Sequence, residues 1–220
     1  MVLGTVLVVA ALFLFIWNQR ENNEAGMFAK KILSQVIEQI EMSGAAKETE
    51  GETGYPNPYD SAMTEVEIDG YAYIGYLSVP VLELELPVMS EWDYDRLKTA
   101  PCRYVGSTKT DDLVICAHNY SRHFGTIHNL SVGDAVYFTD MDGKIWKYEV
   151  TAVDLLAPTD VENMTAGEDD LTLFTCTYSG GSRVTVRCQR TENESIQERC
   201  GKWAEENIYG EFLEWYYSTH

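Results

Sequence analysis

Hydrophobic positions near the N-terminus form first an unbroken run and then a periodic stripe. Residues 2–17 carry no charge. A helix of this length covers roughly 25 Å, the lower edge of what the apolar core of a bilayer requires. We therefore expect residues 1–18 to form a transmembrane anchor; the rival interpretation, a cleaved signal peptide, lacks a basic leading segment and a small-residue cleavage site. From Met27 to Met42, apolar residues recur at steps of three and four, which predicts an amphipathic helix packed on the domain that follows.

The next part of the chain changes from helical to strand-type periodicity. Residues 43–57 lose all periodicity and are rich in Gly, Glu and Thr, which indicates a flexible acidic linker, so residues 19–65 as a whole connect the anchor to a globular domain. Short alternating or apolar runs then follow one another closely, which favours a closed β-barrel over an alternating strand–helix sheet. We expect seven or eight strands, drawn from residues 71–79, 82–88, 113–116, 135–139, 145–153, 171–175 and 183–188, with a short helix over 92–99.

The chain beyond the strands returns to a helical pattern. Ser195 and Glu198 fit a capping box, and apolar residues are interspersed with acidic ones after them. The sequence therefore predicts a mainly β fold with short helices and an N-terminal helix. In this interpretation the barrel covers residues 66–192 and a helical tail covers 193–220.

The charge balance excludes some classes of partner. Acidic residues outnumber basic ones 35 to 16, which gives a formal net charge of −19. Nucleic acids and anionic lipid surfaces are bound through Lys and Arg, so we expect no nucleic-acid partner. No cofactor is expected to be required, and the acidic segment 157–170 is expected to be a solvated loop. Calcium is a lesser alternative there, because the segment offers hard oxygen ligands at Asp160, Glu162, Glu168, Asp169 and Asp170.

Two segments place reactive side chains at the ends of predicted strands. The strand over residues 113–116 is followed by His118, and the strand over 171–175 is followed by Cys176. After a glycine-containing turn, the next strand begins at Arg183. A thiol, an imidazole and a guanidinium in one cleft are the minimum set for acyl transfer through a thioester: a nucleophile, an acid–base group and an oxyanion stabiliser.

The five cysteines limit other chemistry. No CxxC is present, so neither a zinc knuckle nor a thioredoxin-type pair is supported. The histidines at 118, 123 and 128 are five residues apart, which suits no zinc helix, and we expect His123 and His128 to be loop or surface residues. Whether the remaining cysteines form disulfides or stay as buried thiols is left open: Cys102, Cys116, Cys188 and Cys200.

The reactive segments resemble the sortase family of cysteine transpeptidases over roughly residues 66–190. The signature T-L-x-T-C stands here at residues 172–176, and A-H-N after an apolar strand resembles the family's histidine segment. The opening strands, over residues 74–80 and 86–88, are similar too. Ala117 departs from the pattern, because Gly is usual before the histidine. The resemblance implies a sortase-like closed barrel, and the short 157–170 loop differs from the helical insertion of the iron-acquisition class.

The resemblance also implies a role for each reactive residue. Cys176 would attack the threonine carbonyl of an LPxTG-like sorting signal, and His118 would protonate the leaving amine and deprotonate the incoming one. Arg183, which begins the strand after the cysteine turn, would stabilise the oxyanion or hold the substrate backbone. Arg187 lies on the same face of that strand, so the face alone does not choose between the two arginines. Asn119, Thr175 and Tyr178 are expected to shape the substrate pocket.

The implied setting is the outside of a Gram-positive-like cell. The enzyme would be a single-pass protein of the cell membrane with an extracellular catalytic domain. Its partners would be surface proteins that bear a sorting signal, and an amine of peptidoglycan or of a pilin as acceptor. Asn57-Pro58-Tyr59 is similar to the lid of pilus-building sortases, and a plain linker turn is the alternative interpretation.

Two other functions are compatible with parts of the pattern. An L,D-transpeptidase is also a Cys/His acyl transferase of the cell wall. That family places Gly before and Arg two residues after its cysteine, whereas this chain has Thr175 and Tyr178. The second alternative is a surface binding module with a β-barrel and no catalytic activity.

Overall fold

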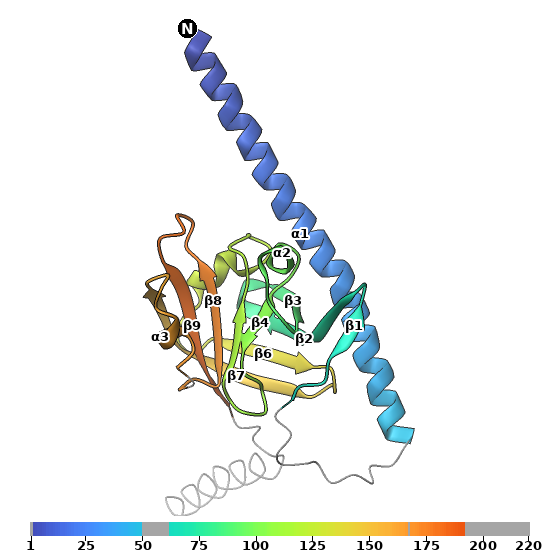
Figure 1. Ribbon diagram of the computed structural model, residues 1–220. Helices are drawn as coiled ribbons and strands as arrows, with labels where there is room; N and C mark the ends of the chain where they lie inside the picture. The colour runs from blue at the N-terminus through green and yellow to red at the C-terminus, as the bar shows by residue number, and fades with distance from the viewer. Residues whose placement is uncertain (1, 50–61, 167, 192–220) are drawn as a thin grey trace, which may run out of the picture. The chain divides into compact units, whose positions relative to one another are not determined.

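A computed structural model describes residues 2–49, 62–166 and 168–191, and nine strands in these ranges form one sheet (Figure 1). Eight of the strands close into a barrel because β2 pairs with β3 on one side and with β6 on the other, and β1 extends the sheet beyond β2. The expected closed barrel of seven or eight strands is confirmed. The strands are β1 (Val66–Ile68), β2 (Tyr71–Val79), β3 (Leu84–Met89), β4 (Cys102–Val105), β5 (Leu113–Cys116), β6 (Ala135–Asp140), β7 (Ile145–Leu156), β8 (Leu171–Cys176) and β9 (Arg183–Arg190).

Two of the pairings in the barrel are parallel, and they differ greatly in extent. β5 runs parallel to β8 along its full length, from Leu113 opposite Leu171 to Cys116 opposite Phe174. β3 and β4 are also parallel, but their pairing rests on the single residue pair Met89 and Cys102. The other pairings are antiparallel.

Alternation along the strands produces two layers of buried side chains. On β8, Leu171 and Leu173 belong to the main apolar cluster, which fills the barrel. Phe174 points to the opposite face and joins a second cluster on the outside of the barrel, which includes Cys116 and residues of the N-terminal helix. The outer face of β5 and β8 is therefore also partly covered.

A single helix, α1 (Val2–Thr49), contains both the apolar run and the amphipathic stripe of the N-terminal region. It continues to Thr49, so the segment from residue 43 to 49 is helical and not the linker that the sequence predicts. The stripe packs on the barrel as expected, and Lys31 forms an ion pair with Asp69 at 3.0 Å. The buried helix residues are Ala25, Ala29, Ile32, Leu33 and Val36.

Short helices occupy the connections between strands. They are α2 (Tyr94–Leu97), α3 (Val161–Met164) and the 3₁₀ segments η1 (Pro80–Leu82) and η2 (Phe124–Asn129). The Asp93 side chain caps α2 by accepting hydrogen bonds from the amides of Asp95 and Arg96, so the helix expected over residues 92–99 is present in a shorter form.

The transmembrane anchor expected over residues 1–18 is not supported: in the described part of the chain, no helix combines the length and the apolar character needed to cross a bilayer. Two other predictions fall outside the described ranges, namely the lid-like Asn57-Pro58-Tyr59 and the helical tail over 193–220.

Candidate active site

Strand register brings the three predicted reactive residues to one edge of the barrel. Because β5 and β8 are parallel with Cys116 opposite Phe174, His118 and Cys176 each lie two residues beyond a paired position on neighbouring strands. Arg183 is the direct antiparallel partner of Cys176 on the other side. Residues far apart in the sequence are therefore placed side by side by backbone pairing alone.

Cys176 differs from the other described cysteines in its exposure. It is partly exposed at the end of β8, whereas Cys102, Cys116 and Cys188 are buried. Burial raises the pKa of Cys102 to about 12 and raises the pKa of the other two buried thiols as well. A thiolate is the reactive form of cysteine, so the buried thiols are inert and Cys176 is the candidate nucleophile within the described residues. All four are free thiols in the structure, and Cys200 lies outside the described residues.

His118 has the properties of an acid–base group that is neutral at physiological pH. Burial lowers the pKa of its imidazole, and the positive charge of Lys98 lowers it further. Glu21 of α1 acts in the opposite direction. A neutral imidazole beside a thiol can accept the thiol proton, and the imidazolium that forms can then donate it to a leaving group.

The two arginines of β9 have different surroundings. The guanidinium of Arg183 donates to the carbonyls of Gly180 and Ser182 in its own turn, and it forms no ion pair with a described carboxylate. Arg187 is held by Asp169 at 2.9 Å, by Asp154 at 3.3 Å and by a backbone carbonyl. Arg183 is therefore the arginine that can turn toward a substrate.

The three residues expected to shape the pocket have unequal roles. Thr175 is buried, and its hydroxyl donates to the Ala117 carbonyl at 2.9 Å, which joins the ends of β8 and β5 just before the two reactive side chains. Asn119 donates to the Thr177 carbonyl at 3.4 Å, so it also joins the two segments. Tyr178 is 93% exposed at the tip of the turn before β9. Thr175 and Asn119 thus position the site, and Tyr178 is free to contact a ligand.

A row of aromatic rings, which the sequence analysis did not identify, leads along the outside of the barrel toward Cys176. Phe174 contacts Tyr104 edge-to-face at 5.3 Å, and Tyr104 contacts Trp92 at 5.3 Å. Trp92 in turn contacts Tyr94, which is 75% exposed. Since Phe174 and Cys176 lie on the same face of β8, this row borders the candidate nucleophile. The sequence did contain a sign of this row: the aromatic residues at 92, 94 and 104 stand close together among polar residues, where no alternating pattern requires them in a core.

The sequence predicts a loop or surface position for His123, and the loop is what the structure shows. The residue is nevertheless fully buried, and no described group makes a hydrogen bond of good geometry to either ring nitrogen. Its ring is 5.6 Å from that of Tyr120, which is 5.0 Å from that of His118. The burial arises because α1 and the barrel enclose the loop, which residue spacing cannot show.

The burial of His123 makes stability depend on pH. Burial lowers its pKa to about 4, below the value of about 6.5 in an unfolded chain. The unfolded state binds the proton more readily, so stability is full above pH 6.5 and is lost as the pH falls toward 4, by up to about 3 kcal/mol. We expect His123→Phe to reduce this acid destabilisation in urea unfolding at pH 7 and 4.5. The exposed His128→Gln serves as control, and an unchanged pH dependence in His123→Phe would contradict the prediction.

The acidic segment between β7 and β8 offers little support for calcium. Within the described residues, no group of three or more metal-binding side chains is gathered. Asp169 is engaged by Arg187, and Asp170 accepts a hydrogen bond from the Arg190 amide. These carboxylates therefore have protein partners, and calcium binding stays an untested prediction.

Comparison with known proteins gives one consistent result. A family model described as the sortase domain matches residues 77–191, more than half of the chain. Sortase A of Bacillus anthracis is 28% identical over 120 residues, and the match covers 52% of this chain and 57% of that protein. The match thus spans little more than half the length of this relative.

Solved structures show the same fold. A sortase D5 transpeptidase of Clostridium perfringens has a TM-score of 0.55 at 18% identity and covers 75% of this chain and 99% of its own. Sortase C of Streptococcus pneumoniae has a TM-score of 0.52 at 20% identity, over 73% of this chain and 96% of its own. Sortase A of Corynebacterium diphtheriae has a TM-score of 0.52 at 17% identity, and the match covers 81% of this chain and 95% of that protein. With the family model matched across β3 to β9, this chain belongs to the sortase family.

Proposed function

We propose that this protein is a cysteine transpeptidase that cleaves an LPxTG-like sorting signal through a thioacyl intermediate and transfers the cleaved protein to an amine. The observation that carries the proposal is the convergence of three groups at one strand edge. Cys176 is the described cysteine with an accessible thiol, Arg183 is its direct strand partner, and His118 follows the parallel strand next to it. Family membership supports the same activity.

The reaction divides into two acyl transfers. In the first, the Cys176 sulfur attacks the threonine carbonyl as its proton passes to His118, and the oxyanion is stabilised by the Arg183 guanidinium. The C–N bond then breaks, His118 protonates the leaving amine, and a thioester remains. In the second, an acceptor amine attacks the thioester, His118 takes the proton from that amine, and the thiol is released with a new amide bond.

For this mechanism, Arg183 must leave its contacts with the Gly180 and Ser182 carbonyls. Both contacts are partly exposed hydrogen bonds to carbonyls, of 3.3 and 3.2 Å, and each contributes about 1 kcal/mol net. The oxyanion of the tetrahedral intermediate offers a stronger, charge-assisted bond, so the exchange becomes favourable as the Cys176 sulfur attacks the carbonyl.

The surroundings of the site are suited to an extended peptide with apolar side chains. The aromatic row from Phe174 to Tyr94 supplies an apolar surface next to the nucleophile, and Tyr178 lies on the turn beyond it. We propose that the substrates are surface proteins that bear a sorting signal, and that the acceptor is an amine of peptidoglycan or of a pilin outside the cell.

A panel of fluorogenic peptides tests the function. Peptides of the LPxTG and xPxTG kinds are incubated with the protein, with and without triglycine as an added amine. The expected result is cleavage after threonine and, with amine, a product whose new amide bond is identified by mass spectrometry. If no peptide is cleaved, and if Cys176 is alkylated slowly and no faster than the other cysteines, the result would support the non-catalytic binding module instead.

A further inference from the structure

The N-terminal helix α1 directly contacts the loop that carries His118. The Asn22 side-chain oxygen accepts a hydrogen bond from the Ser121 amide at 3.1 Å, across 99 residues of sequence. One turn later, Gly26 packs against Arg122 so closely that an added Cβ would lie 2.8 Å from the Arg122 Cγ atom. Glycine at position 26 is therefore what allows the helix to approach the loop.

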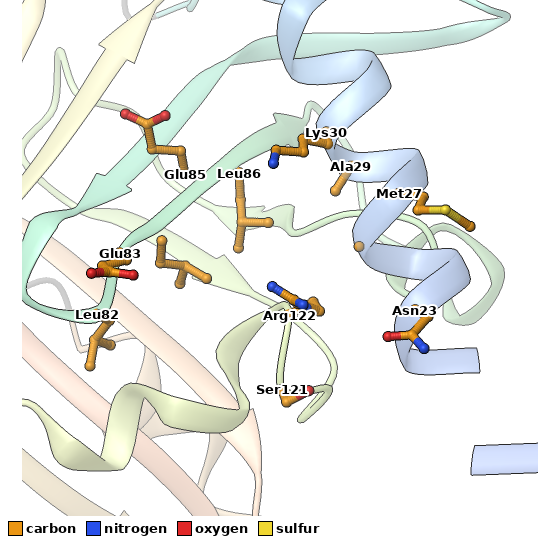
Figure 2. A pocket seen from close by; sticks show the side chains of 12 residues that line it. Asn23, Met27, Ala29, Lys30, Leu82, Glu83, Glu85, Leu86, Ser121 and Arg122 are labelled. Carbon is orange, nitrogen blue, oxygen red and sulfur yellow. The ribbon is translucent and has the colours of Figure 1, made fainter. Parts of the chain in front are cut away.

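Open space lies beside this contact between the helix and the loop. A cavity of about 670 Å³ lies between α1, the segment from Leu82 to Leu86, and the loop residues Ser121 and Arg122 (Figure 2). Figure 2 shows Arg122 extending into this space and Asn23 and Met27 of α1 along its border. The cavity separates the loop from the segment Leu82 to Leu86, so on this side the loop is contacted by α1.

Inside the loop, three rings connect the helix contact to His118. His123 is buried, and its ring contacts the ring of Tyr120, which contacts the ring of His118. No described group makes a hydrogen bond of good geometry to either nitrogen of His123. The buried Ala25 of α1 is close enough for its backbone to act on the His123 imidazole. A shift of α1 would thus reach His118 through rigid aromatic groups.

The charged and titratable groups around His118 come from three elements. Glu21 lies on α1, Lys98 follows α2, and Tyr120 and His123 belong to the loop itself. Glu21 raises the pKa of His118, whereas burial and Lys98 lower it. Removing the Glu21 charge is therefore expected to lower that pKa further.

From these contacts, we propose that the segment of α1 from Glu21 to Gly26 is a positioning element for His118. It holds the loop through Ser121, Arg122 and His123, and so sets the orientation of the imidazole toward Cys176. This inference rests on the proposed function for the role of His118, but the contacts themselves can be tested without any turnover.

The main test is Gly26→Ala in the full chain, with Gly4→Ala as matched control. Gly4 lies on the same helix with no atom within 4 Å of an added Cβ, so its substitution adds only helix propensity. We expect Gly26→Ala to lower kcat for peptide transfer by about tenfold or more, with KM unchanged, because a misplacement of about 1 Å at a reacting group has effects of this size. Arg122→Ala removes the Cγ atom and is expected to restore part of the activity in the double variant.

Two further measurements keep the inference testable if Gly26→Ala fails to fold or if no peptide is turned over. Asn22→Ala removes the bond to Ser121 without adding bulk, with Asn23→Ala as control, and the alkylation rate of Cys176 is followed. In parallel, the His118 titration is recorded by NMR for Glu21→Gln and for Glu24→Gln. We expect slower alkylation only in Asn22→Ala and a lower His118 pKa only in Glu21→Gln.

The possible outcomes separate the two proposals. If peptides are not transferred by the parent protein but alkylation and the His118 titration respond as expected, the function fails and the positioning role stands. If Gly26→Ala matches Gly4→Ala in kcat, Asn22→Ala matches Asn23→Ala in alkylation, and Glu21→Gln matches Glu24→Gln in the His118 titration, the positioning role is overturned whatever the function.

Discussion

Cys176→Ala is expected to lose peptide cleavage and transfer together, with a rate at least about 10³-fold below that of the parent protein. The thioester cannot form without the sulfur, and the remaining groups can only assist a far slower attack by water. The side chain is partly exposed at the end of β8, so its removal leaves no sealed cavity in the core. We therefore expect the unfolding midpoint in urea to stay nearly constant.

A neighbouring thiol supplies the control for this substitution. Cys116 is buried at the end of β5, opposite Phe174, and its sulfur donates to the Cys102 carbonyl. Cys116→Ala is expected to retain transfer activity but to lose about 1–2 kcal/mol of stability through the cavity it leaves. Transfer that persists in Cys176→Ala, or that is lost only in Cys116→Ala, would remove Cys176 as the nucleophile.

Arg183→Ala is expected to lower kcat for transfer by about 10²–10³-fold, which is the usual effect of removing one oxyanion donor. Its present bonds are to backbone carbonyls of its own turn and not to a carboxylate, so the folded state loses little. The measurement is kcat and KM with the best peptide of the panel, together with urea unfolding of both proteins.

Arg187→Ala is the matched variant, and we expect it to lower stability more than Arg183→Ala does and to lower kcat less. Arg187 connects Asp169, Asp154 and the Asn163 carbonyl, and it is 15% exposed. Its removal leaves a partly buried carboxylate without its partner, for which we expect a stability loss of about 2–3 kcal/mol and a much smaller change in kcat. A large loss of kcat in Arg187→Ala with none in Arg183→Ala would exchange the roles of the two arginines.

Much of the barrel could be predicted because strand periodicity is a local signal. Alternating or apolar runs identified the strands, and the positions of His118 and Cys176 just after such runs implied strand ends. Local patterns do not show that the ends of β5 and β8 meet at one edge, because this follows from the parallel pairing of the two strands.

Two of the features that could not be predicted depend on contacts between distant segments. His123 follows a polar stretch and gives no sign of burial, yet α1 and the barrel enclose it completely. The shared face of Arg183 and Arg187 could not choose between them, and the preference for Arg183 came from its place at the start of the strand; the carboxylates that hold Arg187 lie elsewhere in the chain and support that preference. The extent of α1 was also missed, since its residues from 43 to 49 carry no apolar stripe.

The pairing of β3 with β4 is the shortest in the barrel, because it consists of a single residue pair. Besides the pair Met89 and Cys102, the Arg103 guanidinium donates to the Ser90 carbonyl across this line, whereas β7 and β9 share eight partners. β4 is therefore joined to β3 by far fewer bonds than β9 is to β7. Meanwhile β8 and β9, paired from Leu171 to Cys176, hold the backbones of Cys176 and Arg183 next to each other. The barrel thus combines one short pairing, between β3 and β4, with a fully paired reactive edge at β8 and β9.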